Sequence, residues 1–135
     1  MPYKLAVIML GESGSGKSTF ARTLCADDKC IFSTDDYFME NGVYNFDPTK
    51  LGEYHARNLV RFSFALSCGE PVVVCDNTNT QPWMYEKYVQ EVAKCSDYVL
   101  LIVKMPALSV EELVKRNTHK VPRHAIERMV KDLRG

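Results

Sequence analysis

The stretch Gly11-Glu12-Ser13-Gly14-Ser15-Gly16-Lys17-Ser18 lies between an apolar run, residues 5–10, and a segment with helical spacing, residues 17–26. It matches the pattern Gly-x-x-x-x-Gly-Lys-Ser, in which glycines let backbone N–H groups turn inward around a phosphate without a Cβ in the way. The helix that begins near Lys17 adds the positive end of its dipole. We therefore expect a nucleoside-triphosphate site, in which Lys17 bridges the β- and γ-phosphates and the Ser18 hydroxyl binds Mg²⁺.

Continuous apolar runs alternate with helical patterns along the rest of the chain. We expect strands at residues 5–10, 30–33, 71–76 and 98–103, helices at residues 17–26, 49–68, 82–94, 109–116 and 122–133, and a loop at residues 36–48. This alternation is typical of right-handed βαβ crossovers and of a parallel sheet covered on both faces. The expected fold is α/β, in three layers, with a four-stranded parallel sheet, flanking helices and a short C-terminal lid, in one domain over residues 1–135.

Charge is distributed unevenly along the chain, although 17 Lys or Arg balance 17 Asp or Glu. Residues 1–114 hold 10 basic and 15 acidic side chains, whereas residues 115–135 hold 7 basic and 2 acidic ones. A basic tail on an acidic body indicates a localised site for anions. For Lys131 and Arg134, however, we expect only solvated positions on a helix.

Cysteine usage and hydropathy indicate the compartment. Five cysteines is an odd number, and no pair has Cys-x-x-Cys spacing, so we expect buried free thiols in a reducing environment. No apolar run approaches the roughly 20 residues that span a bilayer. We therefore expect a cytoplasmic protein that does not contact a membrane.

Carboxylates follow two of the expected strands, at the sheet edge where ligands of parallel sheets bind. Asp35 and Asp36 come after the second strand, and we assign Asp35 to the chemistry, as the base that takes the proton of an acceptor hydroxyl. Asp36 is expected to cap a helix N-terminus, to lie in a solvated turn or to have a structural role. Asp76 ends the third strand and is expected to hold Mg²⁺ or its water shell. The residues after it, 77–79, either orient the acceptor or cap the next helix.

Arg116 and Arg123 flank a break at residues 117–121, which we expect to be a lid. A lid arginine neutralises charge on the transferring phosphoryl group. We favour that role for Arg116 over a helix-end position, whereas for Arg123 the two are balanced. We expect His119 to be a polar loop residue, and His55 faces either the crevice or solvent. The ATP-binding set is therefore Gly11, Glu12, Ser13, Gly14, Ser15, Gly16, Lys17, Ser18, Thr19, Arg116 and Arg123, in which Thr19 packs or caps rather than binds.

Taken in order, these motifs resemble the polynucleotide 5′-hydroxyl kinase family of P-loop phosphotransferases. The likeness runs through the glycine loop, Asp35-Asp36-Tyr37, Asp76-Asn77-Thr78-Asn79, residues 112–117, Val121-Pro122 and Arg128-Met129. It implies that Asp35 is the general base for a 5′-hydroxyl, that Lys17 and Ser18 act on ATP and that Arg116 is the lid arginine. Two features depart from the family. The arginine that the family carries after Asp-Asp-Tyr is Phe38 here, and the lid is shorter, with Arg123 standing in for its second arginine.

Three functions follow in order of preference. The first is an ATP- and Mg²⁺-dependent kinase that phosphorylates a 5′-hydroxyl of DNA or RNA. The second is a kinase of the same fold that acts on a small metabolite or nucleoside, which the neutral net charge and Phe38 favour. The third is a nucleotide-binding interaction module without turnover, which the joint presence of Lys17, Asp35 and Arg116 disfavours. The absence of an Asn-Lys-x-Asp motif and of a water-orienting glutamine favours transfer over hydrolysis.

Overall fold

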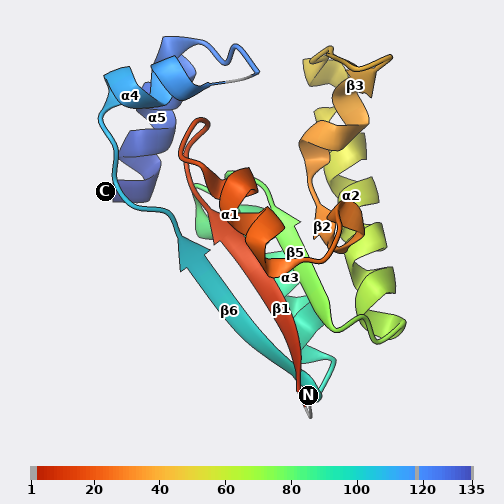
Figure 1. Ribbon diagram of the computed structural model, residues 1–135. Helices are drawn as coiled ribbons and strands as arrows, with labels where there is room; N and C mark the ends of the chain where they lie inside the picture. The colour runs from red at the N-terminus through yellow and green to blue at the C-terminus, as the bar shows by residue number, and fades with distance from the viewer. Residues whose placement is uncertain (1–2, 118, 135) are drawn as a thin grey trace.

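Four parallel strands form the central sheet of the computed structural model, which describes residues 3–117 and 119–134. Their order across the sheet is β2 (Ile31–Phe32), β5 (Val72–Asp76), β1 (Lys4–Leu10) and β6 (Tyr98–Lys104) (Figure 1). Each pairing is parallel, with Val7 opposite Val74 on one side and Leu101 on the other. The expected four-stranded parallel sheet is confirmed.

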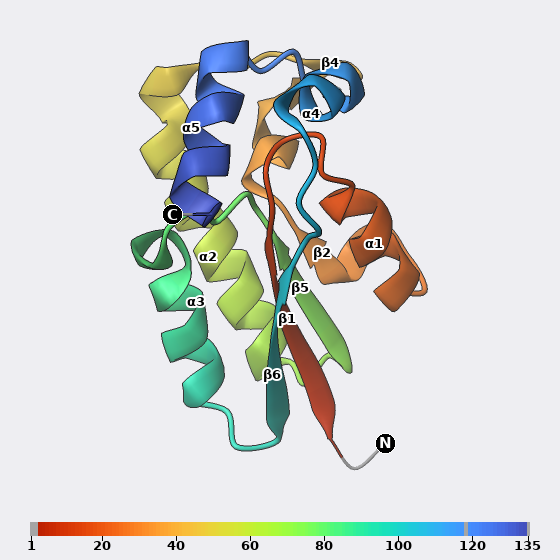
Figure 2. The same ribbon diagram turned by 90° about the vertical axis from the view of Figure 1, so that its left-hand side faces the viewer.

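Helices flank the sheet on both faces. The helix α1 (Lys17–Leu24) lies on one face, and α2 (Leu51–Ser67) and α3 (Pro82–Ala93) lie on the other (Figure 2). Two further helices, α4 (Val110–Arg116) and α5 (Arg123–Arg134), follow β6 and lie beyond the carboxyl ends of the strands. Ser109 caps α4, because its hydroxyl accepts a hydrogen bond from the backbone N–H of Glu112 at 3.1 Å.

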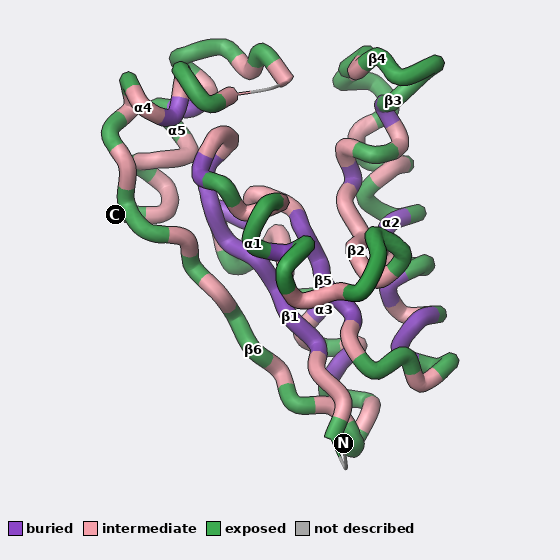
Figure 3. Tube along the Cα trace, in the orientation of Figure 1, coloured by how far each residue is buried: buried purple, intermediate pink, exposed green. Residues whose placement is uncertain are grey.

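The core consists of two layers that the pleat of the sheet separates. Alternate residues of β1 and β5, such as Ile8 and Cys75, pack with Phe62 of α2 and Tyr88 of α3. The intervening residues, such as Val7 and Val74, pack with α1 on the opposite face. Figure 3 shows the resulting contrast, with β1 and β5 buried over most of their length.

The strand β6 departs from the expectation that every strand is covered on both faces. It is an edge strand, and Val99, Leu101 and Ile102 keep 43%, 45% and 48% of their surface exposed. Val99 and Leu101 are exposed because α1, only 8 residues long, packs on β1 and β5 and does not cover them. Ile102 lies on the opposite face, opposite Ile8. A continuous apolar run identified the strand correctly but not its burial.

The segment expected to be a loop, residues 36–48, contains regular structure. The 3₁₀ helices η1 (Asp28–Cys30), η2 (Thr34–Phe38) and η3 (Pro48–Lys50) surround a hairpin of β3 (Met39–Glu40) and β4 (Val43–Tyr44). Asn41 and Gly42 form its turn with φ of 50° and 78°, the conformation that Asn-Gly dipeptides favour in two-residue hairpins. This hairpin carries a residue of the candidate site.

Two cysteine expectations are wrong. Cys25 and Cys30 form a disulfide, because the turn between α1 and β2 brings their Cα atoms to 6.3 Å, within the range that a bridge requires. Cys68 is exposed, whereas Cys75 is a buried free thiol as expected. Within the described part of the chain, no helix is both long and apolar enough to cross a bilayer.

Candidate active site

The glycine loop joins β1 to α1 and has the backbone that phosphate binding requires. Gly14 and Gly16 have φ of 86° and 88°, the left-handed region that side chains with a Cβ rarely adopt. A Cβ on Gly14 would also collide with the backbone carbonyl of Leu113, so the loop packs directly against α4. Gly16 is the N-cap of α1, and the N-terminus of this helix therefore points into the loop.

Ser18 and Asp76 form the expected pair for a metal ion. The Ser18 hydroxyl donates a hydrogen bond to Asp76 Oδ2 at 2.7 Å, and Asp76 is 4% exposed. Its second oxygen, Oδ1, is buried without a hydrogen-bond partner among the described residues. A buried carboxylate oxygen with unused acceptor capacity beside a hydroxyl fits Mg²⁺, which takes one or two protein oxygens and completes its shell with phosphate and water. The described residues contain no denser cluster of metal-binding side chains.

Asp35 is held by residues from two other segments. Tyr44 of the hairpin donates its phenolic hydrogen to Asp35 Oδ1 at 3.1 Å. His119 Nε2, from the loop after α4, lies 3.9 Å from Asp35 Oδ2, and its ring lies 4.1 Å from that of Tyr44. Partial burial and the adjacent Asp35 carboxylate raise the pKa of Tyr44, so the phenol stays protonated and donates. The carboxylate is thus fixed in orientation.

Asp36 follows Asp35 in the same 3₁₀ turn and lines the same cleft. Withdrawal from solvent, followed by repulsion from Asp76, Asp35 and Asp28, raises its pKa. The carboxylates of Asp36 and Asp76 therefore share one electrostatic environment next to the glycine loop. A bound cation would relieve this repulsion.

These groups line one cleft of about 550 Å³ at the carboxyl ends of the strands. Its walls include Ser13, Gly14, Gly16, Lys17, Ser18, Thr19, Arg22, Asp35, Asp36, Asp76, Arg116 and His119. Arg116 reaches the cleft from the end of α4, and its Nε also bonds Glu112 Oε1 at 2.6 Å. The structure thus brings together Lys17, Ser18, Asp35, Asp76 and Arg116, as the sequence predicted.

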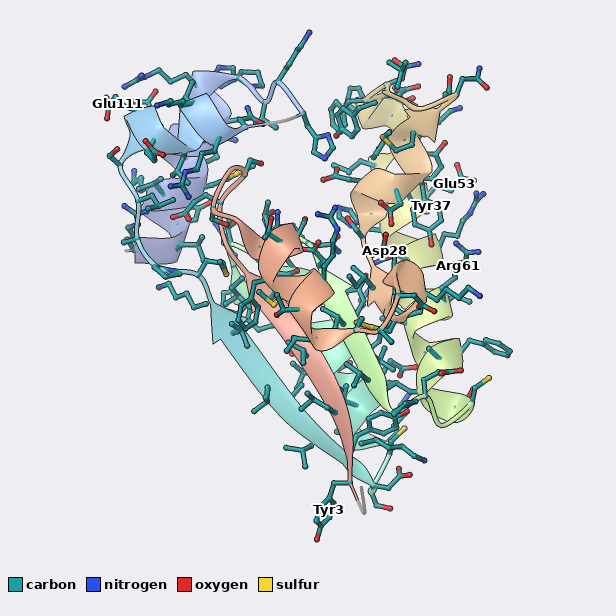
Figure 4. All side chains as sticks on the ribbon, in the orientation of Figure 1. Tyr3, Asp28, Tyr37, Glu53, Arg61 and Glu111 are labelled. Carbon is teal, nitrogen blue, oxygen red and sulfur yellow. A yellow bond between two sulfur atoms is a disulfide. The ribbon has the colours of Figure 1, made fainter. Side chains whose placement is uncertain are left out.

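Other predicted site residues lie elsewhere. Arg123 pairs with Glu111 at 2.8 Å and does not line the cleft; Figure 4 shows Glu111 on the outer side of α4. The carboxylate of Glu111 on α4 thus holds the Arg123 guanidinium outside the cleft, and contact of Arg123 with ATP stays a prediction. Gly11, Glu12 and Ser15 are buried behind the loop and do not line the cleft.

Glu12 and Arg134 form an ion pair that the sequence did not predict. The Glu12 side chain is 3% exposed, and its Oε1 lies 3.0 Å from Arg134 Nη2 of the last turn of α5. The same nitrogen donates to the carbonyl oxygen of Leu108 at 2.8 Å. Arg134 is thus not the solvated helix residue that we expected, and it ties α5 to the phosphate-binding loop.

The residues after Asp76 hold the strand ends together. Asn77 Oδ1 accepts the N–H of Thr34, the Thr78 carbonyl accepts that of Gly11, and Asn79 Nδ2 donates to the Met9 carbonyl at 2.8 Å. This bracing differs from both roles considered for the segment. His55 Nδ1 lies 2.9 Å from the Thr34 hydroxyl, next to the cleft.

Three cleft or cleft-supporting residues were missed from the sequence. Arg22 lies one turn after Ser18 on α1, and this i, i+4 spacing was a usable signal. Tyr44 and His119 reach Asp35 only through the hairpin and the loop after α4, so local spacing gave no signal for them.

The fold and the cleft define a P-loop kinase domain. A family model described as "AAA domain" matches residues 7–135, and the chain belongs to this family. It is 39% identical over 129 residues to human "NEDD4-binding protein 2", a match that covers 92% of this chain and 7% of that protein. It is 32% identical over 130 residues to the "Putative bifunctional polynucleotide kinase/RNA ligase" of Autographa californica nuclear polyhedrosis virus, with 84% and 18% coverage.

Among solved structures, the chain resembles one titled "Structure of Pnkp1/Rnl/Hen1 complex", with a TM-score of 0.62 and 28% identity over 86% of this chain and 40% of that one. The chain thus spans less than half of each of these relatives. Together they confirm the resemblance to polynucleotide kinase-like proteins.

Proposed function

We propose that residues 1–135 form a single kinase domain that transfers the γ-phosphate of ATP to a 5′-hydroxyl of DNA or RNA, with Mg²⁺. The observation that carries this proposal is the position of Asp35, which lines the same cleft as Lys17 and Ser18. Such a cleft holds donor phosphates on one side and a proton acceptor on the other, as in-line transfer requires. A nucleotide-binding module without turnover would not need a proton acceptor in the cleft.

In the proposed reaction, the acceptor oxygen attacks the γ-phosphorus while the bond from that phosphorus to the β–γ bridging oxygen breaks. Asp35 takes the proton of the acceptor hydroxyl, and ADP leaves. Lys17 and the glycine-loop N–H groups hold the β- and γ-phosphates, and Arg116 neutralises charge on the transferring group. Ser18 and Asp76 would hold Mg²⁺, which supplies charge neutralisation at the phosphates when bound.

The names of two relatives support a polynucleotide acceptor, since one is the "Putative bifunctional polynucleotide kinase/RNA ligase" and the other belongs to the Pnkp1/Rnl/Hen1 complex. A metabolite kinase is the second candidate, because the net charge is zero and Phe38 is 2% exposed. A buried phenyl ring at that position gives no charge to an acceptor phosphate.

A transfer assay discriminates between these candidates. Radiolabelled γ-phosphate ATP is offered with 5′-hydroxyl oligonucleotides of DNA and RNA beside a panel of nucleosides and sugars. We expect label on the oligonucleotides, and label on a metabolite alone would contradict the proposal. ATP hydrolysis without any labelled acceptor would favour neither kinase.

The identity of the base is tested by a matched pair of variants. We expect Asp35→Asn to abolish transfer while binding of a fluorescent ATP analogue survives, because Asp35 serves the acceptor. The neighbouring Asp36→Asn is the control, with a smaller loss of transfer. The raised pKa of Asp36 makes it the rival base, so loss of transfer in Asp36→Asn alone would reassign the role.

A further inference from the structure

A second groove of about 720 Å³ lies next to the cleft and has no part in the chemistry above. It runs between α2 and the η1–β2–η2 segment and shares Asp28, Ile31, Ser33 and Asp36 with the cleft. The two cavities therefore lie next to each other along the segment that contains Asp35. A polymer whose end lies at Asp35 has this groove beside it.

We propose that this groove binds the acceptor strand, with Arg61 on a backbone phosphate and Tyr37 stacked on a nucleobase. The inference rests on the proposed function and names the acceptor subsite beyond the 5′-terminal nucleotide. Its basis is the combination of arginine and tyrosine at the mouth of a groove that lies beside the catalytic carboxylate.

The arginines and tyrosines on this wall are in contact. The guanidinium carbon of Arg61 lies 5.8 Å from the centre of the Tyr37 ring, and that of Arg57 lies 5.9 Å from the same ring. Tyr54 stacks on Tyr37 at 5.6 Å, which fixes the ring. A preordered aromatic face beside a cation is the combination that single-stranded nucleic acids use, through base stacking and phosphate attraction.

Arg61 is the cation of the α2 wall of the groove. Arg57 is paired with Glu53 at 3.0 Å, whereas within residues 3–117 and 119–134 no carboxylate lies at ion-pair distance from Arg61. Figure 4 shows Arg61 and Tyr37 on the same side of the molecule as Asp28. An exposed arginine that lies along a groove and has no acidic partner is suited to a phosphate.

The opposite rim determines which part of the strand faces each wall. The η1 side of the groove carries Asp27, Asp28 and Lys29, a net charge of −1, so phosphates are favoured on the α2 side, near Arg61. Glu70 also lines the groove, beyond the end of α2. Val60 and Phe64 of α2 extend the same wall and are 67% and 68% exposed, which offers apolar surface to successive bases. A small uncharged metabolite would have no use for this length of wall.

The test measures how transfer depends on acceptor length. The full chain is assayed with a nucleoside 3′-monophosphate and with 5′-hydroxyl oligonucleotides of two, four and eight residues. We expect kcat/KM to rise with length in the wild-type protein. The ratio of kcat/KM for the octamer to that for the mononucleotide should fall roughly tenfold in Arg61→Gln and five- to hundredfold in Tyr37→Leu, within the range measured for lost base stacking.

Salt dependence supplies a second measurement. If Arg61 contacts one phosphate of a single strand, the slope of log kcat/KM against log salt for the octamer should become less steep by about 0.7 in Arg61→Gln. Lys87→Gln is the matched control, because Lys87 is an exposed lysine on α3, away from the groove, and removes the same charge. Arg61→Lys keeps the charge and should retain most of the salt slope but lose part of the length dependence.

The outcomes are distinguishable. Labelled oligonucleotides with an unchanged length ratio and salt slope in both Arg61→Gln and Tyr37→Leu would overturn this inference and leave the proposed function intact. Label on a metabolite alone in the wild-type protein would overturn both. Since the arginine–tyrosine contacts also join η2 to α2, thermal unfolding of each variant is measured, and Arg61→Lys replaces any variant that does not fold.

Discussion

The ion pair between Glu12 and Arg134 predicts a loss of stability on removal of its surface partner. Glu12 lies inside the phosphate-binding loop with its side chain 3% exposed, so Arg134→Gln would leave a buried carboxylate without its cation. Breaking a fully buried pair costs about 3–5 kcal/mol, whereas an exposed pair contributes about 0–1 kcal/mol. Because the Arg134 side chain is 32% exposed, solvent screens part of the effect, and we expect about 2 kcal/mol.

Urea titration followed by circular dichroism measures this free energy, and the melting temperature should fall by about 6–10 °C for a domain of this size. Lys131→Gln is the matched control, since Lys131 is exposed on the same helix and removes the same charge. Glu12→Gln should be much less destabilising, because a neutral amide needs no counter-ion.

The double variant Glu12→Gln, Arg134→Gln completes a cycle that isolates the coupling between the two side chains. We expect it to be more stable than Arg134→Gln alone, because the buried charge is gone. A loss below about 0.5 kcal/mol in Arg134→Gln, equal to that of Lys131→Gln, would refute the reasoning and assign the contact to ordinary surface pairs.

Three further predictions concern the cleft. Arg116→Ala should slow transfer by roughly 10²-fold if it stabilises the transferring phosphoryl group, with Lys115→Ala as the neighbouring control, and an unchanged kcat would return Arg116 to a helix-end role. Tyr44→Phe should lower kcat about tenfold with the KM for ATP unchanged, since only the orientation of the catalytic carboxylate is lost; an altered KM for ATP alone would contradict this. Asp76→Asn should raise the stability of the nucleotide-free protein and lower the pKa of Asp36, because it removes a repulsive charge. Thermal stabilisation by ATP with Mg²⁺ should disappear in the same variant. If ATP with Mg²⁺ stabilises the variant as much as the wild-type protein, Asp76 has no metal role.

The donor side of the cleft could be predicted from the sequence because its residues are contiguous. The glycine loop, Lys17 and Ser18 follow one another, and the chain direction of a parallel sheet carries Asp76 to the same edge. Local patterns also identified four strands and five main helices. The spacing of apolar residues in a helix or a strand follows the period of its backbone, so it can be recognised in the sequence.

The remaining features depend on contacts between distant segments. The exposure of Val99 and Leu101 on β6 follows from the short length of α1, and the pairing of Glu12 with Arg134 joins positions 122 residues apart. Neither feature has a local sequence signature. An apolar run has the same pattern in a covered strand and in an exposed one, and an arginine near the end of a helix has the same pattern whether it is solvated or paired. The bridge between Cys25 and Cys30 was missed because spacing without Cys-x-x-Cys was taken to favour free thiols.

The side of the cleft that we propose for the acceptor therefore depends on contacts between distant segments, and one buried ring supports much of it. Phe38 packs against Tyr44, Phe46 and Tyr54, with ring centres 6.1, 5.0 and 4.7 Å away. These contacts hold the hairpin where Tyr44 reaches Asp35, and they link it to the Tyr54 ring that supports Tyr37. Phe38, which has no charge for a phosphate, thus supports both Tyr44 and Tyr37, the two tyrosines of the proposed acceptor side. In this chain, contact with acceptor phosphates would pass from that position to the arginines of α2.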